Sequence, residues 1–394
     1  MKIKIKHILI LTSLLLTVFI YVGCGPVREF YRFPDYKGDN GFSYSLPNYD
    51  STKKTILIVA DNKGTEIFDL MAPFHLFNLT HKANVYIVAE KKYPIVVMKG
   101  FFTLPHFTYN EIDSLHIQPS AIVIPNLSAM DKKALNPFIV AWIKSKYTNT
   151  TKVLSVCVGS LTAAATGLYD GKPLTTHASE IKSCEKQFNS PKWVKNTSVT
   201  KSNNLYSTAG VSNAVEGSLT IIRDMFGEQV MKDVIDSIHY PHRDIKMKHS
   251  SIALSMGSNL TIGNKIYFKK NRKIGVLLQD GIDEFRIAGV LDTYHRTFPG
   301  SIETFSTGGK SILTKHGLTV IPTGDFKQIK KLDELHVLMP ELLPKSEEVA
   351  FENTTLVKYS TSDKEYIIDL CLKRIKDQYD DKFENITRLL LDYN

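Results

Sequence analysis

The sequence predicts an α/β fold in which parallel sheets are covered by helices on both faces, and it predicts two copies of that fold. Short runs of Ile, Val and Leu, such as Ile56–Ala60 and Ala121–Pro125, alternate with amphipathic segments, as is typical of parallel sheets buried on both sides. A further apolar strand at residues 153–156 leads directly into Cys157, Gly159 and an alanine-rich stretch, which indicates a strand-to-helix turn. Part of this pattern returns later, and 394 residues are enough for two domains.

The N-terminus is typical of a bacterial export signal. Lysines at positions 2, 4 and 6 precede an apolar run at residues 8–20, which is too short for a membrane span and ends just before Cys24. We expect residues 1–24 to be a lipoprotein signal peptide, Cys24 to be lipidated, and residues 25–50 to be a tether to the envelope membrane. An uncleaved anchor or an ordinary secretory signal is the alternative.

Cys157 is the first candidate for chemistry. A strand-to-helix turn places the sulfur beside the unpaired N–H groups and positive end of a helix, which favour thiolate. The sequence therefore predicts a nucleophile with a depressed pKa, provided that any neighbouring carboxyl group carries a proton. The alternative is a cysteine that only packs in the core.

The motif containing Cys157 is one of four that occur in a familiar order, together with residues 66–74, 167–177 and 205–216. Together they resemble the ThiJ/PfpI superfamily, in its isonitrile hydratase-like and AraC-associated branch, over residues 53 to 245. The resemblance implies a flavodoxin-like sandwich of the class I glutamine amidotransferase-like type, with the nucleophile on the turn after a central strand. It also implies that Asp69 is the acidic partner of Cys157 and that His177 lies near the sulfur.

Two departures from the family pattern leave the specific activity open. Val158 occupies the position after the cysteine, where the hydratase pattern has threonine and the protease-like members have histidine. Asn126 and Leu127 replace a pair of glycines, and asparagine tolerates a left-handed backbone better than most residues. We expect the backbone N–H groups at Val158 and around Asn126 to hold a developing oxyanion.

A repeat runs through both halves of the chain. Gly64, Phe68, Gly100 and Pro105 recur at one constant offset as Gly281, Phe285, Gly317 and Pro322. In the second copy Arg286 replaces the acid and Val290 replaces Pro73, and no cysteine turn follows Pro340. A helix-like segment from Asp363 to Tyr393 ends the chain. These features predict a tandem duplication whose second copy is truncated and lacks the nucleophile turn.

The predicted organisation places a ThiJ/PfpI-like domain at residues 51–247, a linker at 248–271 and a degenerate half-domain at 272–394. Two β-prone triplets in the linker, at residues 260–262 and 266–268, favour a short hairpin. We expect the half-domain to dock onto the first domain as a pseudo-dimer partner and to shape the Cys157 pocket, and a homodimer would serve the same purpose. The alternative is that residues 272–394 form an independent domain that does not dock onto the first.

Composition and residue spacing limit the classes of partner, metal and cofactor that the chain can bind. The net charge of +9 is spread along the chain without a long basic run, which argues against nucleic-acid binding. Cys157, Cys184 and Cys371 have neither disulfide nor zinc spacing, and Cys184 is either a resolving thiol or a packed helix residue. His239, His242 and His249 lack a nearby ligand cluster and are typical of a solvated loop. We expect no metal and no cofactor.

Three functions remain open. The first is an envelope-anchored hydrolase, hydratase or lyase in which Cys157 attacks a small carbonyl or imine-like substrate, with Asp69 moving the proton and His177 assisting. The second is a non-enzymatic redox sensor or small-molecule-binding lipoprotein in which the thiol is oxidised. The third, an AraC-type regulatory ligand domain, is remote, because an exported protein does not reach the chromosome.

Overall fold

The computed structural model describes residues 34–38, 42, 47–128, 132–329, 331–345, 353–360 and 363–394. The proposed signal peptide, Cys24 and most of the tether lie outside these residues. Within the described part of the chain, no helix is both long enough and apolar enough to cross a membrane.

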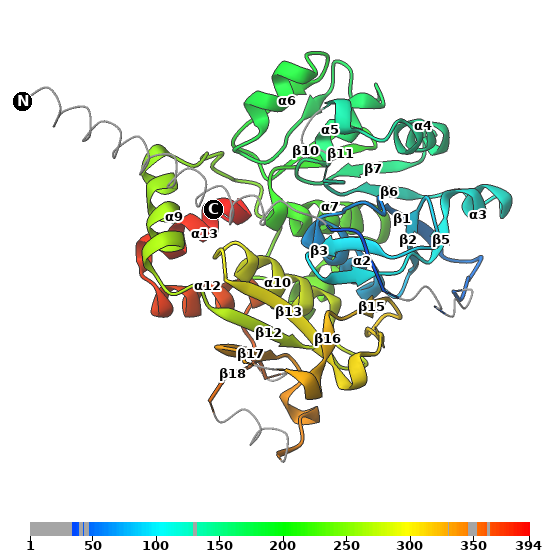
Figure 1. Cartoon of the computed structure of the whole chain (residues 1–394). Coiled ribbons are helices and arrows are strands. Elements are labelled where there is room, and N and C mark those ends of the chain that lie inside the picture. The colour runs from blue at the N-terminus through cyan, green and yellow to red at the C-terminus, as the bar shows by residue number, and fades with distance from the viewer. Residues whose placement is uncertain are drawn as a thin grey trace, which may run out of the picture.

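A seven-stranded sheet organises the first unit (Figure 1). Its order is β10 (Val199–Ser202), β11 (Leu205–Thr208), β7 (Lys152–Ser155), β6 (Ala121–Ile124), β1 (Lys54–Val59), β2 (Ala83–Ala89) and β5 (Phe107–Thr108). Neighbouring strands are parallel except for the antiparallel pair β10 and β11. The predicted α/β fold with a mainly parallel central sheet is therefore confirmed.

Both faces of this sheet are buried, as the continuous apolar strands predict. Along β1, Ile56 and Ile58 belong to a core cluster with α2 (Ile67–Leu79) and α7 (Ala214–Phe226). The alternate residues Leu57 and Val59 belong to a second cluster on the other face. That face is covered by α3 (Tyr109–Ser114), α4 (Pro137–Lys146) and α5 (Gly159–Ala165). The alternation follows from the two-residue period of a strand.

A five-stranded, wholly parallel sheet organises the second unit. Its order is β16 (Gly324–Asp325), β13 (Ser301–Ser306), β12 (Lys273–Leu277), β17 (Glu334–Val337) and β18 (Thr355–Lys358). In both units the first strand lies between the second strand and a later one, and a helix follows the first strand. That helix is α2 in the first unit and α10 (Glu284–His295) in the second.

The two units meet along α2 and α10 and through a shared sheet. The ring centroids of Phe68 on α2 and Phe285 on α10 are 5.4 Å apart. A four-stranded sheet joins the hairpin β3 (Ile95–Met98) and β4 (Phe101–Thr103) to β15 (Thr319–Ile321) and β14 (Ile312–Leu313), with β4 antiparallel to β15. The largest core cluster contains side chains from both units, so the two units share one hydrophobic core.

The linker between the units contains a helix instead of the expected hairpin. The helix α9 (Met256–Phe268) begins with a capping box between Ser255 and Ser258. Ile262 and Ile266 on this helix pack against Phe298 and the last helix of the chain. The β-prone triplets are therefore helical because tertiary packing and the cap outweigh their local preference.

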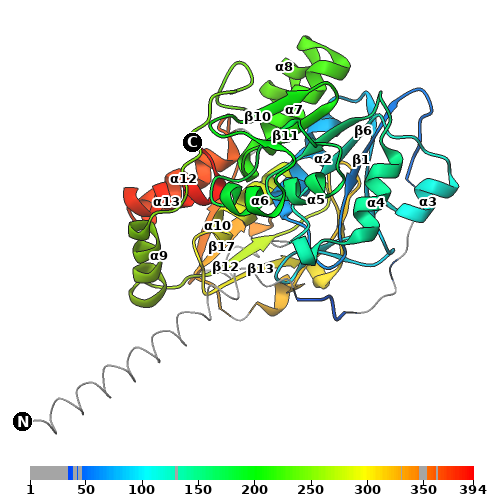
Figure 2. The same ribbon diagram turned by 90° about the horizontal axis from the view of Figure 1, so that it is seen from above.

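The C-terminal segment, predicted as one helical stretch, forms two helices, α12 (Ile367–Gln378) and α13 (Asp381–Leu391). Asp380 starts the second helix by accepting a hydrogen bond from the backbone N–H of Phe383. Both helices lie beside α9 on one side of the molecule (Figures 1 and 2). The end of α13 reaches the first unit there, next to the Cys157 turn.

Candidate active site around Cys157

Cys157 lies on a strained turn between β7 and α5. Its φ is +50°, a left-handed conformation that non-glycine residues rarely adopt. Gly159 is required by space, because a Cβ there would lie 2.2 Å from the carbonyl oxygen of Ile124. The hydroxyl of Thr176 donates to the carbonyl of Cys157 at 2.9 Å and holds the turn from outside. Cys157 is only 2% exposed, yet it lines a cavity of about 570 Å³.

Two acidic residues at the start of α2 approach this turn. Glu66 caps the helix by accepting a hydrogen bond from the backbone N–H of Asp69 at 2.7 Å. Asp69 Oδ2 accepts from the backbone N–H of Asn126 at 3.0 Å, while the buried Oδ1 has no hydrogen-bond partner among the described residues. Burial raises the pKa of Asp69 to about 7 and raises the pKa of Glu66 well above its usual range. Near neutral pH, Asp69 can therefore both take up and release a proton.

The electrostatics of Cys157 differ from the expected thiolate. Burial raises the pKa of the thiol well above its usual range, and the charges of Asp69 and Glu66 raise it further. The backbone N–H of Val158 and the guanidinium of Arg296 lower the pKa, but they are outweighed. The prediction of a depressed pKa is therefore wrong, because it gave weight to the helix end and omitted the cost of burying a charge.

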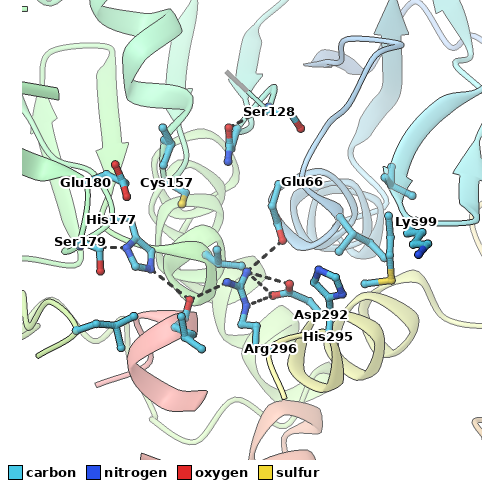
Figure 3. A pocket seen from close by; sticks show the side chains of 18 of the residues that line it. Glu66, Lys99, Ser128, Cys157, His177, Ser179, Glu180, Asp292, His295 and Arg296 are labelled. Carbon is cyan, nitrogen blue, oxygen red and sulfur yellow. Dashed lines mark hydrogen bonds and ion pairs between the residues drawn. The ribbon is translucent and has the colours of Figure 1, made fainter. Parts of the chain in front are cut away.

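The second unit supplies the charges on the opposite wall of the cavity (Figure 3). Arg296, at the end of α10, lies with Nη2 2.9 Å from Asp292 Oδ1 and 3.4 Å from Glu66 Oε1. Its Nη1 donates to the carbonyl of Leu390, the end of α13, at 2.8 Å. The guanidinium thus binds two carboxylates and a helix C-terminus, which connects both units at the rim of the site.

His177 lines the same cavity but both of its nitrogens are engaged. Nδ1 accepts from the backbone N–H of Ser179 at 3.2 Å, and Nε2 lies 3.2 Å from the carbonyl of Leu390 (Figure 3). Because Nδ1 accepts, the ring proton is on Nε2 and is donated to the end of α13. His177 therefore positions the end of α13 against the first unit. Neither ring nitrogen is left to form a hydrogen bond with the Cys157 sulfur.

The two backbone N–H groups expected to hold an oxyanion, at Val158 and around Asn126, have other partners in the structure. The backbone N–H of Val158 donates to the Cys157 sulfur, so it lies at the reacting atom. The backbone N–H of Asn126 donates to Asp69 and is not free for a substrate. The left-handed residue of this loop is Ser128, at φ +57°, and its N–H donates to the side chain of Asn126. Asn126 therefore orders the loop and the acid.

The cavity is built from both units and the linker. Its polar lining includes Glu66, Asn126, Ser128, Cys157, His177, Ser179, Glu180, Asn259, Asp292, His295 and Arg296. Glu66 lies in the first of the four motifs, but glutamate is not a preferred N-cap residue, so the sequence alone does not indicate its role. The roles of Asp292 and Arg296 could not be predicted either, because no local pattern shows that the end of α10 reaches the other unit.

Comparison with known proteins agrees with the fold of the first unit. Residues 53–224 match the family described as "DJ-1/PfpI family". The isonitrile hydratase of Pseudomonas putida is 24% identical over 159 residues, which is 40% of this chain and 67% of that protein.

Among solved structures, Schizosaccharomyces pombe DJ-1 is 23% identical and has a TM-score of 0.40, with 47% of this chain and 97% of that chain covered. A ThiJ/PfpI family protein from Pseudomonas syringae is 19% identical and has a TM-score of 0.42, with 53% and 84% covered. The match of residues 53–224 to the family confirms a DJ-1/PfpI (ThiJ/PfpI) domain in the first unit.

Proposed function

Because residues 53–224 form a DJ-1/PfpI family domain, we propose that the protein is a cysteine-dependent hydratase, hydrolase or lyase acting on a small electrophile. The observation that carries this proposal is a cavity-lining thiol on a strained turn, next to a buried carboxyl that raises the pKa of the thiol and whose own pKa is about 7. A thiol with a raised pKa is not ionised in the resting site. Its proton must leave as the sulfur attacks, and Asp69 is the group that can accept it.

The chemistry balances with the groups present. The Cys157 sulfur bonds to the electrophilic carbon of a C=O or C=N group, and the thiol proton passes to an Asp69 oxygen. The π electron pair moves to the oxygen or nitrogen of the substrate, which then takes the proton back from Asp69. The adduct then expels a leaving group from this carbon; the leaving group takes the proton of the new O–H or N–H group, and the C=O or C=N bond forms again as a thioester or thioimidate. Water adds to this carbon, and the resulting tetrahedral adduct expels the sulfur, which takes a proton that came from the water and is a thiol again. The N–H of Val158 stabilises negative charge on the sulfur as it leaves.

The electrostatics favour this function over redox sensing. Peroxide oxidises a thiolate that it can reach. Burial beside two acids limits the access of peroxide to the sulfur and lowers the fraction of the cysteine that is ionised. Cys157 is 2% exposed and burial raises its pKa, so we infer slow oxidation. A sensor remains the alternative proposal, and sulfenate formation at micromolar peroxide would favour it.

We further propose that the second unit arose by duplication and serves as a built-in partner for the first. The equivalent strand orders, the facing helices α2 and α10, and the pairing of β4 with β15 support this proposal. Arg286 occupies the position that corresponds to Asp69 and donates to the carbonyl of Ser360. On this proposal the second unit lost the chemistry and kept Asp292 and Arg296 to complete the Cys157 cavity.

The test of the proposed function is covalent labelling and turnover with a panel of small carbonyl, nitrile and isonitrile compounds. We expect label on Cys157 alone, because Cys184 and Cys371 are buried and line no part of the cavity. Cys157→Ser is expected to lose label and turnover, and Cys184→Ser serves as the matched control that keeps both. Turnover that survives in Cys157→Ser contradicts the proposal.

We also propose that the chain is held at the cell envelope by lipid on Cys24, on the basis of the N-terminal sequence. We expect Cys24→Ser to release the protein from the membrane fraction or to leave the precursor unprocessed. Metabolic labelling with a fatty acid and fractionation measure this, and Cys184→Ser again provides the control. A Cys24→Ser protein that fractionates and migrates like the parent rules out lipid attachment.

A further inference from the structure

A second cluster of chemically active side chains lies between the units, away from Cys157. His75 is in the middle of α2, Glu284 begins α10, and His316 is in the turn before β15. Nδ1 of His75 lies 2.8 Å from Glu284 Oε2, and Nδ1 of His316 lies 2.9 Å from the same oxygen. The proposed reaction uses none of these groups.

The cluster has the composition and spacing of a metal site. The two imidazole nitrogens and the carboxylate oxygen all lie within 4.8 Å of one another. Two histidines and one carboxylate are a common ligand set for zinc and neighbouring divalent transition metals, with water in the remaining position.

The surrounding groups orient these ligands as an outer coordination shell does. Nε2 of His75 lies 3.3 Å from Asp283 Oδ2, which leaves Nδ1 directed toward Glu284. The backbone N–H of His316 donates to Glu284 Oε1 at 2.8 Å and fixes the carboxylate. Metal-binding histidines usually donate their second N–H to a carboxylate in this way, and ligating carboxylates are themselves hydrogen-bonded.

The site also has an approach from solvent. His75 and Asp283 line a cavity of about 390 Å³ that is separate from the Cys157 cavity. The side chain of His316 is 12% exposed, whereas those of His75 and Glu284 are 2% and 0% exposed. Neither Glu284 nor His316 lines this cavity, so an ion approaches the cluster where the side chain of His316 is exposed, and it keeps a water ligand there.

We propose that His75, Glu284 and His316 bind one divalent transition-metal ion of the zinc type, which fastens α2 of the first unit to α10 and the β15 turn of the second. Sequence spacing could not reveal this site, because His75 and Glu284 are separated by most of the first unit. The ion holds the two units together and takes no part in the chemistry at Cys157. The competing description is an ion pair in which protonated imidazoles bind Glu284 and Asp283 without a metal.

Cobalt(II) is the probe that distinguishes the two descriptions. The full chain carrying Cys157→Ser, so that no active-site thiolate contributes, is freed of metal with a chelator and titrated with Co²⁺. We expect one equivalent to bind, with the visible ligand-field bands of a low-coordinate nitrogen and oxygen site, and Zn²⁺ to displace it. His316→Gln and Glu284→Gln are expected to lose the bands, whereas His242→Gln, at an exposed histidine, keeps them.

Two further measurements keep the test independent of folding. Asp283→Asn retains all three ligands, so its affinity is expected to fall about 10- to 100-fold without loss of the bands. Added Zn²⁺ is expected to raise the melting temperature of the parent and of His242→Gln, but not that of His316→Gln, because a ligand of the folded state stabilises it. Absence of bands in the parent, or equal binding by His316→Gln and the parent, overturns the proposal in favour of the ion pair.

Discussion

A chain that ends at Met247 is expected to lose its stable monomeric fold. The cut removes α10, whose Phe285 covers Phe68 on α2, and it opens the core cluster that both units share. Each large apolar side chain that returns to water costs about 1.5–3 kcal/mol. Several such side chains together approach the ~5–15 kcal/mol that stabilises a typical domain. Light scattering after gel filtration and thermal melting measure the result, which we expect to be self-association or a melting temperature near ambient.

Single substitutions provide a graded version of this test. Phe285→Ala is expected to destabilise the full chain by about 3–5 kcal/mol, because it leaves a cavity between the units. Phe268→Ala on α9 is the matched control, since Phe268 is 70% exposed and its loss is expected to cost little. If the fragment that ends at Met247 is monomeric, has the melting temperature of the parent and is labelled normally at Cys157, the second unit is an independent domain.

The second large effect is expected for Asp69→Asn, which should separate thiol reactivity from catalysis. Removing the negative charge lowers the pKa of Cys157, so labelling by iodoacetamide at pH 8 to 9 is expected to rise. Turnover is expected to fall about 10²- to 10⁴-fold, because the group that accepts the thiol proton is gone. A residue with a purely structural role would lower both rates together or neither.

The pH dependence of the parent follows from the same carboxyl group. The pKa of Asp69 is about 7, so turnover of the parent should rise as the pH passes through that value and Asp69 becomes able to accept a proton. Asp69→Asn should lose this rise. Glu185→Gln, at an exposed carboxylate on another helix, is the control and should follow the parent. Equal turnover of Asp69→Asn and the parent at pH 7 would remove Asp69 from the mechanism.

Stability provides a further readout of Asp69 with a definite sign. The folded protein holds the Asp69 proton more tightly than the unfolded chain, whose pKa is near 3.8. Stability is therefore lost as the pH rises from about 4 to about 7, by roughly 4 kcal/mol for a shift of this size. Asp69→Asn should accordingly be more stable than the parent at pH 8 and similar to it at pH 4.

The sequence was most informative where a local pattern determines structure. The strand, Cys157 and Gly159 predict the turn because a glycine two residues after the cysteine lets the backbone pass close to the Ile124 carbonyl, where a Cβ would clash. The continuous apolar run of β1 likewise predicts a sheet buried on both faces. These features depend on residues a few positions apart, or on a strand period that is visible in one segment.

The features that could not be predicted depend on contacts between distant segments. Arg296 reaches Glu66 only because α10 packs against α2, and His177 is engaged only because α13 ends beside it. The raised pKa of Cys157 arises from burial by several elements together. α9 is helical because its apolar face covers Phe298, which overrides the β preference of its residues.

The antiparallel pairing of β4 with β15 has a consequence for solubility. An unpaired strand edge offers a row of N–H and C=O groups on which another chain can add a strand. In the hairpins β3–β4 and β14–β15, one strand of each is instead paired with the hairpin of the other unit, through Phe102 with Ile321 and Thr103 with Val320. Each unit thus covers one strand edge of the other, and that protection is present in every molecule at any concentration because both hairpins are on one chain.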